Sequence, residues 1–240
     1  MLDILEKSLE NVPRTELNSF YRVKTLWADD CFMSIPFLAR LGAMRDEKYF
    51  DDAVVQVKGF RHYLYMEDKK IYSHIYFPED KKANRIPWGR GNGWVILALS
   101  ELLMLMPQSH KDYETVLSAF REIAEGIMAC QGKNGMWHQL IDEETTYEES
   151  SGTCMYIIAL SRAIKNKWID DLFKDNLIRA WNRLSETCID DEGNIMGICV
   201  GSGCNKEREY YRVLPPCIND DHGVGIFLLA ATEVDSLARV

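Results

Sequence analysis

The sequence has no surplus of basic residues. It holds 28 Lys and Arg against 37 Asp and Glu, and its formal net charge is −9. Proteins that bind nucleic acid or an anionic membrane surface without specificity normally present a basic face. We therefore expect no nucleic acid and no membrane as partners, although one focused Arg or His can still bind an anionic ligand.

The chain also lacks paired cysteine motifs and long apolar runs. Its seven cysteines are odd in number and scattered, without C-x-x-C spacing, which indicates neither a disulfide framework nor a zinc site. No His, Asp or Glu cluster has metal-ligand spacing, so we expect no metal and no cofactor. No stretch approaches the ~20 apolar residues of a membrane span, and the acidic N-terminus does not resemble a signal peptide. These features predict a cytoplasmic protein.

Helical periodicity does run through the chain, in pairs of segments. In each pair the first segment is nearly all apolar and the second is amphipathic. We expect helices at 30–44 and 49–66, at 95–106 and 113–131, and at 155–164 and 170–188, with a single further helix after 220. The pairs start roughly 60 to 70 residues apart, which is an internal repeat. The pattern predicts an all-α fold, a toroid of helical hairpins forming one domain over 1–240, with the apolar helices inside.

Polar or glycine-rich clusters open each expected inner helix, and in a toroid these openings converge on one mouth. The clusters are Trp27–Asp30, Trp88–Trp94, Glu149–Thr153 and Asn219–Gly225. The links at 70–76, 135–142 and 193–197 mix aromatic and polar residues, as short strands or extended loops would. We expect these links to line the same mouth, which would bring His74, Trp137 and His138 there. For a single histidine the alternative is a partly buried side chain with satisfied hydrogen bonds.

The stretch from Trp88 to Trp94, Trp-Gly-Arg-Gly-Asn-Gly-Trp, combines residue types suited to an anionic sugar ring. Aromatic faces bind the C–H surfaces of sugars, and the guanidinium of Arg90 matches a carboxylate. The glycines allow close approach of the backbone to a ligand. The alternative is a glycine-rich start of a helix whose tryptophans belong to the core.

Four ordered motifs resemble the unsaturated rhamnogalacturonyl hydrolases of glycoside hydrolase family 105, relatives of the family 88 unsaturated glucuronyl hydrolases. The motifs are Pro13-Arg14-Thr15 with Phe20, Trp27–Asp30, Trp88–Trp94 and Asn219–Gly225. The resemblance implies an (α/α)6 barrel. It also implies a hydrolase of 4,5-unsaturated galacturonyl oligosaccharides from pectin or rhamnogalacturonan breakdown, acting by hydration of the C4=C5 double bond.

The resemblance also implies roles for individual residues. Asp29 would be the catalytic acid and base, and the family match selects it over Asp30, since an aspartate at a helix start commonly caps backbone N–H groups. Arg90 would pair with the uronate carboxylate. The further residues expected to bind substrate are Trp88, Trp94, His74, Trp137 and His138, with Glu149–Thr153 and His222 shaping the rim.

The sequence departs from the family in one respect. Members normally carry about two further hairpins before the segment with which this chain begins, so the toroid is expected to be incomplete at its N-terminus. Three forms agree with that: a fragment, a homo-oligomer that closes the pocket, or an inactive carbohydrate-binding protein of the same fold. A helical scaffold for protein partners would explain the hairpins, but not the aromatic, Arg and His residues at the helix starts.

Overall fold

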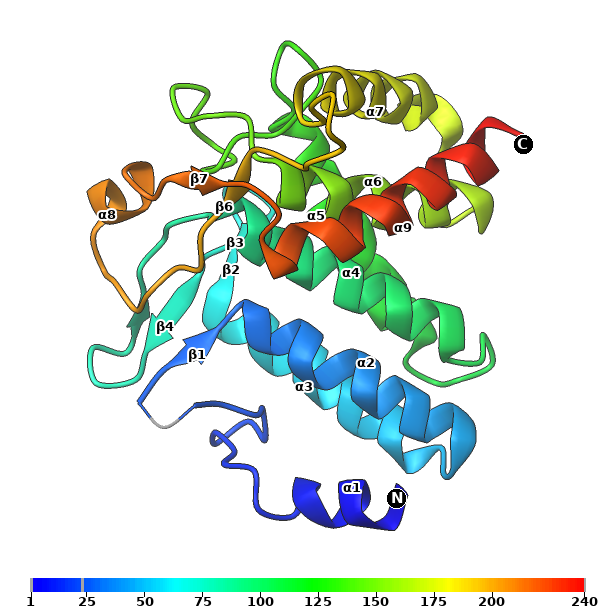
Figure 1. The fold of residues 1–240 in the computed structure, drawn as a ribbon. Helices are drawn as coiled ribbons and strands as arrows, with labels where there is room; N and C mark the ends of the chain where they lie inside the picture. Colours follow the sequence, from blue (N-terminus) through cyan, green and yellow to red (C-terminus); the bar gives the residue numbers. More distant parts are fainter. Residues whose placement is uncertain (1, 23, 240) are drawn as a thin grey trace.

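The computed structural model describes residues 2–22 and 24–239, and in this part of the chain the inner helices form one row. Helix α2 (Asp29–Met44) packs beside α4 (Gly89–Leu105), which packs beside α6 (Ser150–Lys165), and α6 packs beside α9 (Asp221–Ala238). Figure 1 shows α2, α4 and α9 running in the same direction. Their N-terminal ends therefore lie on one side, as the predicted mouth requires.

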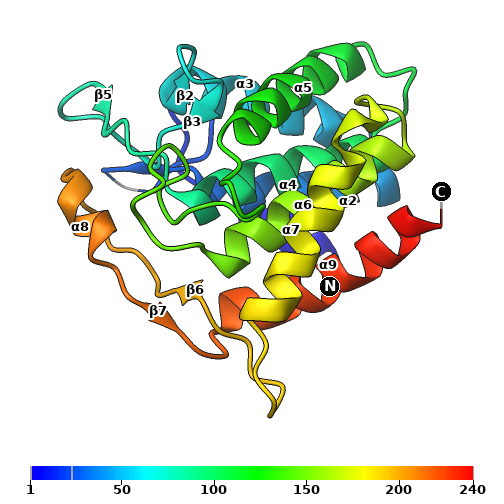
Figure 2. The same ribbon diagram turned by 90° about the horizontal axis from the view of Figure 1, so that it is seen from above.

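Amphipathic helices cover the row on its outer side. They are α3 (Lys48–Leu64), α5 (Tyr113–Ala129) and α7 (Lys174–Thr187), the last preceded by the 3₁₀ turn η1 (Asp171–Phe173). Each packs on the inner helix before it in the chain, and Figure 2 shows α3 and α5 together on one side of α2 and α4. The residues of α4 from 95 to 99 are at most 2% exposed, because they are enclosed by both neighbours and α5. The predicted inner and outer layers are confirmed.

Short antiparallel strands gather near the N-terminal ends of the inner helices (Figure 1). One sheet has the order β1 (Leu26–Trp27), β4 (Ile75–Phe77), β5 (Lys82–Ala83). The strands β2 (Tyr65–Met66) and β3 (Ile71–Tyr72) form a second pair, and β6 (Ile198–Cys199) and β7 (Pro216–Cys217) a third. The link at 135–142 is irregular instead, with isolated bridges from Leu140 to Trp88 and from His138 to Glu148.

Helix α4 begins at Gly89, so most of the glycine-rich stretch lies inside the helix and not before it. The glycines serve close packing between protein segments. A Cβ atom added at Gly89 would lie 2.9 Å from the His138 carbonyl oxygen, and one at Gly93 would lie 2.6 Å from Met155 Sδ on α6. Small residues here let α4 approach both the 138–139 loop and α6.

Two helices were not predicted from the periodicity. Helix α1 (Leu2–Leu9) lies below α2 and α3 in Figure 1, and α8 (Arg208–Arg212) lies at the far end of a segment between β6 and β7. Both are shorter than the span over which a helical repeat of apolar residues becomes recognisable.

Candidate functional site

A hydrogen bond between Asp29 and His74 forms the centre of the candidate site. Asp29 is the first residue of α2, and His74 lies between β3 and β4. The pairing of β1 with β4 brings them together, because the Ala28 N–H donates to the His74 carbonyl at 2.8 Å. Asp29 Oδ2 then lies 2.9 Å from His74 Nε2. Two residues that the sequence analysis selected from separate segments thus meet.

The surroundings of Asp29 favour its ionised form. His74 is fully buried, whereas the Asp29 side chain keeps 18% of its surface exposed. Burial raises the pKa of Asp29, but His74, the Asp29 backbone N–H and Arg22 together lower it more, so the net pKa lies below the usual 3.8. Asp29 is therefore a carboxylate at neutral pH, partly open to solvent and able to accept a hydrogen bond from His74 Nε2–H.

The second ring nitrogen of His74 contacts Tyr211 of α8. The distance from His74 Nδ1 to Tyr211 Oη is 2.7 Å, and Asn84 Nδ2 lies 3.4 Å from the same hydroxyl. Tyr211 is fully buried, and this burial raises the pKa of its phenol, so the hydroxyl stays protonated. The contacts form a continuous chain from Asn84 through Tyr211 and His74 to Asp29.

Aromatic rings enclose His74. Trp27 meets the imidazole edge-on with a centroid distance of 5.1 Å, Tyr211 does so at 5.4 Å, and Trp88 lies tilted at 4.7 Å. These rings exclude water from the imidazole, which strengthens its hydrogen bonds to the groups on either side.

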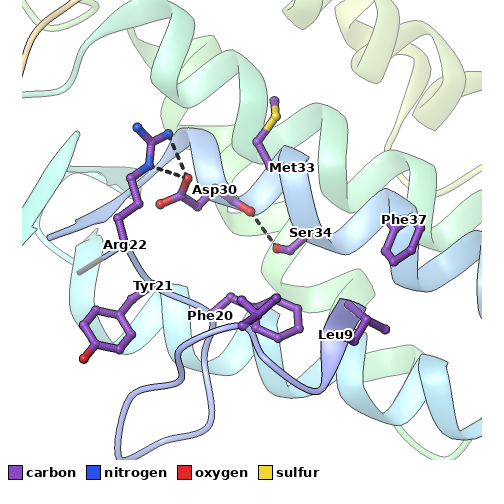
Figure 3. Close-up of a pocket in the computed structure, with 9 residues that line it drawn as sticks. Leu9, Phe20, Tyr21, Arg22, Asp30, Met33, Ser34 and Phe37 are labelled. Atoms are coloured by element: carbon purple, nitrogen blue, oxygen red, sulfur yellow. Dashed lines mark hydrogen bonds and ion pairs between the residues drawn. The ribbon is translucent and has the colours of Figure 1, made fainter. Parts of the chain in front are cut away.

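Asp30 forms an ion pair with Arg22, as Figure 3 shows. Arg22 Nε donates to Asp30 Oδ1 at 2.9 Å, and the Trp27 N–H donates to Asp30 Oδ2 at 3.3 Å. Burial and the neighbouring Asp29 charge raise the pKa of Asp30 more than Arg22 and the Trp27 N–H lower it. The N-cap residue of α2 is Ala28, whose side chain makes no cap hydrogen bond, and it is Asp30 that accepts from the backbone N–H just before the helix. Asp30 and Arg22 border a cavity of about 220 Å³ whose other walls are Leu9, Val12, Phe20, Tyr21, Met33, Ser34 and Phe37.

Both tryptophans of the glycine-rich stretch lie in the interior. Trp88 is 2% exposed and Trp94 is 8% exposed, and the Trp94 ring packs on Phe32 with a centroid distance of 4.7 Å. Of the two tryptophans, Trp88 contacts the His74 ring directly. The stacking of a sugar on these rings stays a prediction.

Arg90 is 1% exposed, and its guanidinium is largely occupied by backbone oxygens. Nη1 donates to the Cys199 carbonyl at 2.5 Å, Nη2 donates to the Val200 carbonyl at 3.0 Å, and the group stacks on Trp88 at 4.6 Å. Arg90 thus connects α4 to the start of the 199–217 segment by hydrogen bonds. Its Nε–H and the Trp88 Nε1–H remain without an acceptor among the described residues.

Trp137 and His138 contact other parts of the structure. Trp137 is 1% exposed, and its Nε1–H donates to the Ile127 carbonyl at 2.7 Å. His138 Nδ1 lies 2.5 Å from the Thr146 carbonyl and therefore carries a proton. Both residues hold the 132–148 loop in place, and neither has a hydrogen bond or ring contact to Asp29 or His74 among those found in the described residues.

Within the expected rim, which was Glu149–Thr153 and His222, the two ionisable residues differ in exposure. Glu149 is 1% exposed and caps α6, where its carboxylate accepts hydrogen bonds from the backbone N–H groups of Ser151 and Gly152 and from that of Cys199. His222 keeps 49% of its side chain exposed and contacts Asp220 at 2.6 Å. Glu149 is therefore a structural anchor, while His222 lies open at the start of α9.

Tyr211 and Asn84 were not predicted as site residues. Tyr211 lies in a run of charged residues from 206 to 212, a composition typical of a solvent-exposed turn, and Asn84 follows a two-residue strand. Neither position belongs to the repeat. The one signal in the sequence is the pair Tyr210-Tyr211, because two adjacent aromatic residues inside a charged run indicate that at least one ring is buried.

Among the described residues, no group of three or more His, Cys, Asp or Glu side chains is arranged to hold a metal ion. Nor does any helix in the described ranges have the length and apolar character needed to cross a membrane.

A family model described as Glycosyl Hydrolase Family 88 matches residues 2–238. The chain is 25% identical to the "Unsaturated rhamnogalacturonyl hydrolase YesR" of Bacillus subtilis over 87% of its own length, and 29% identical to an "Unsaturated 3S-rhamnoglycuronyl hydrolase" of Formosa agariphila, again over 87%. It spans 59% and 57% of the lengths of these relatives.

The fold agrees with solved structures. A glycoside hydrolase of family 105 from C. acetobutylicum superposes with a TM-score of 0.92 at 25% identity, over 98% of this chain and 73% of the other. The expected α/α toroid and the resemblance to these glycoside hydrolase families are both confirmed by these comparisons.

Proposed function

Because the chain belongs to Glycosyl Hydrolase Family 88, we propose that it hydrolyses unsaturated uronyl oligosaccharides by adding water to the C4=C5 double bond. The proposed substrate is a 4,5-unsaturated galacturonyl oligosaccharide of the kind released when a lyase cleaves pectin or rhamnogalacturonan. The names of the relatives, which refer to unsaturated rhamnogalacturonyl and rhamnoglycuronyl substrates, support this class.

The observation that carries the proposal is the Asp29–His74 pair, in which one partly exposed carboxylate is held by a buried donor. In the proposed reaction protonated Asp29 gives its proton to C4, and positive charge develops at C5 and the ring oxygen. Water then adds to C5 while the Asp29 carboxylate takes the water proton. The hemiketal so formed opens and releases the remaining sugar, so one carboxyl group serves as both acid and base.

Asp29 must gain a proton before the first step, although its pKa is lowered in the free protein. The substrate supplies the reason, since a uronate carboxylate entering beside Asp29 adds a like charge and raises the pKa of Asp29. Binding of the substrate is thereby coupled to proton uptake. The partly exposed edge of Asp29 supports this, because solvent can deliver the proton there.

For substrate recognition we propose the residues implied by the family resemblance. The uncommitted N–H groups of Arg90 and Trp88 support a role in binding the uronate carboxylate. Trp94 would wall the ring. Trp137 and His138 are proposed to act from the 132–148 loop, with the burial of Trp137 favouring an indirect contribution.

We also propose that 1–240 forms a single domain, which is supported by a main hydrophobic core with members from Phe20 to Leu237, beside which there is one smaller cluster among the described residues. The cytoplasmic location and the homo-oligomer stay predictions.

Substitution of Asp29 tests the proposal. Asp29→Asn keeps the size of the side chain but cannot give or take the proton, so kcat should fall by about 10²-fold or more. Turnover of an unsaturated galacturonyl–rhamnose disaccharide is followed by the loss of absorbance of the C4=C5 chromophore. Asp30→Asn, the same change one residue later, is the control and should stay within about threefold of the unmodified protein.

Equal rates for Asp29→Asn and the unmodified protein would show that Asp29 is not the acid. Binding of the disaccharide without any loss of absorbance in the unmodified chain would instead favour the inactive carbohydrate-binding protein.

A further inference from the structure

The segment from Ile198 to Cys217, here called the strap, brings Tyr211 to the candidate site. The strap leaves and returns at one place, because Ile198 on β6 pairs with Cys217 on β7. Figures 1 and 2 show α8 carried beyond the N-terminal ends of the inner helices, away from α9. A residue more than 130 positions after His74 in the chain thereby reaches its imidazole.

The base of the strap is fixed by two buried charged groups. Arg90 donates to the carbonyl oxygens of Cys199 and Val200, and the Glu149 carboxylate accepts from the Cys199 N–H at 3.0 Å. Charged hydrogen bonds in a buried setting hold their geometry well, because breaking one leaves a charge unpaired in the interior. The strap therefore starts from a rigid point.

The tip of the strap is fixed as well. Arg208 and Arg212 donate to the two carboxylate oxygens of Glu143 at 2.8 and 2.7 Å. Gln139 Nε2 donates to the Tyr211 backbone carbonyl at 2.7 Å. With both backbone and side chain held, the Tyr211 hydroxyl has a defined position beside His74.

The directions of the hydrogen bonds can be deduced from the backbone. The N–H groups of Ile75 and Ile86 donate to Asn84 Oδ1 at 3.3 and 3.2 Å, which identifies that atom as the amide oxygen. The Asn84 NH₂ group therefore faces Tyr211 Oη at 3.4 Å and donates to it. The Tyr211 hydroxyl is then best placed to donate its own proton to His74 Nδ1.

This direction decides the tautomer of His74. If Nδ1 accepts a hydrogen bond from the Tyr211 hydroxyl, then the neutral imidazole carries its hydrogen on Nε2, which faces Asp29 Oδ2. Without the hydroxyl, Nδ1 would be a buried acceptor with no partner, and the imidazole would lose one of the two hydrogen bonds that fix its plane.

We propose that Tyr211 is a positioning residue of this site: its hydroxyl holds His74 as the Nε2–H tautomer and thereby keeps the Asp29 carboxylate in its reactive orientation. The effect on turnover rests on the proposed function of Asp29, whereas the effect on His74 does not. Tyr211 itself touches neither Asp29 nor the reacting atoms.

Two matched tyrosine variants test the proposal. Tyr211→Phe removes the hydroxyl and keeps the ring, while Tyr210→Phe makes the same change at the neighbouring residue, whose hydroxyl accepts from the Gly203 N–H at 2.7 Å. Histidine is labelled with ¹⁵N in the full chain, and ¹H–¹⁵N correlations separate protonated from unprotonated ring nitrogens. His74→Gln identifies the His74 signals among those of the five histidines.

In the unmodified protein we expect His74 to show a protonated Nε2 and a hydrogen-bonded, unprotonated Nδ1. In Tyr211→Phe the Nδ1 signal should move to the position of an imidazole nitrogen without a hydrogen-bond donor. We expect kcat on the unsaturated disaccharide to fall about tenfold, the size of one lost hydrogen bond, with KM within about twofold. Tyr210→Phe should change neither the spectrum nor kcat.

A protonated Nδ1 in the unmodified protein would overturn the proposal, as would equal kcat values for the two tyrosine variants. If Asp29→Asn keeps full activity or the unmodified chain has no turnover, the proposed function fails. The ¹⁵N spectrum then decides by itself whether Tyr211 sets the tautomer.

Discussion

Two adjacent aspartates have opposite electrostatic surroundings. Both are partly buried, which raises the pKa of each, but for Asp29 the lowering effects, led by His74, outweigh burial, whereas for Asp30 the lowering effects, led by Arg22, do not. Pairs of titratable groups with pKa values pushed apart are typical of sites that separate acid and base roles. The family resemblance selected Asp29 by position in a motif, and the structure adds the physical difference between the two carboxyl groups.

Arg90 shows a limit of reasoning from a motif. Its residue type suits a carboxylate, but two backbone carbonyls more than 100 positions later in the chain occupy both terminal nitrogens. Such partners cannot be inferred from spacing, because any backbone carbonyl in the chain is an acceptor. The motif predicted a substrate carboxylate as the partner of Arg90, and the fold gives its terminal nitrogens two backbone carbonyls.

Arg90→Lys should therefore affect stability. A lysine ammonium lacks the fork that reaches both carbonyls, and we expect the free energy of unfolding to fall by about 1–3 kcal/mol in urea. Arg239→Lys, at a position where the side chain is 75% exposed, is the control and should change it by less than about 0.5 kcal/mol. If Arg90→Lys leaves the free energy of unfolding unchanged but weakens substrate binding, then the hydrogen bonds from Arg90 to the strap contribute little to stability.

At the scale of elements, the close approach of α4 to α6 explains the glycine pattern. An added Cβ at Gly93 would lie 2.6 Å from Met155 Sδ and 3.0 Å from Met155 Cβ. The same addition at Gly225 on α9 would meet no atom within 4 Å. Both glycines stand in motifs that resemble the family, yet only one of the two lies at a tight helix contact.

Gly93→Ala and Gly225→Ala should change stability in opposite directions. Overpacking against Met155 should cost Gly93→Ala about 1–3 kcal/mol of unfolding free energy. Gly225→Ala should gain up to about 1 kcal/mol, since alanine favours the helix and meets no neighbour. Urea unfolding measures both. A similar value for the two variants would contradict the contact between α4 and α6.

For the whole molecule, periodicity was sufficient to predict the layers. The apolar character of the segments at 95–106 and 155–164 identified helices enclosed on both sides, and their amphipathic partners identified the outer layer. The polar starts of the inner helices lie on one side, as the repeat predicted, but the direct contact between Asp29 and His74 was not predicted.

The strap could not be predicted in the same way. Its position depends on ion pairs and backbone contacts between distant segments, such as Arg212 with Glu143 and Arg90 with Val200. The sequence between Val200 and Pro215 has neither helical nor strand periodicity over a useful length. The contact of Tyr211 with His74 therefore follows from the folded structure and not from the sequence.

The central claim is that the reaction hydrates the C4=C5 bond and does not displace the leaving group at the anomeric carbon. The most direct measurement follows, in one reaction of the full chain with the unsaturated disaccharide, both the absorbance of the double bond and the release of rhamnose. We expect absorbance to fall in step with rhamnose release, with one double bond lost for each rhamnose freed. Rhamnose release while the absorbance persists, or no change in either signal, would contradict the account.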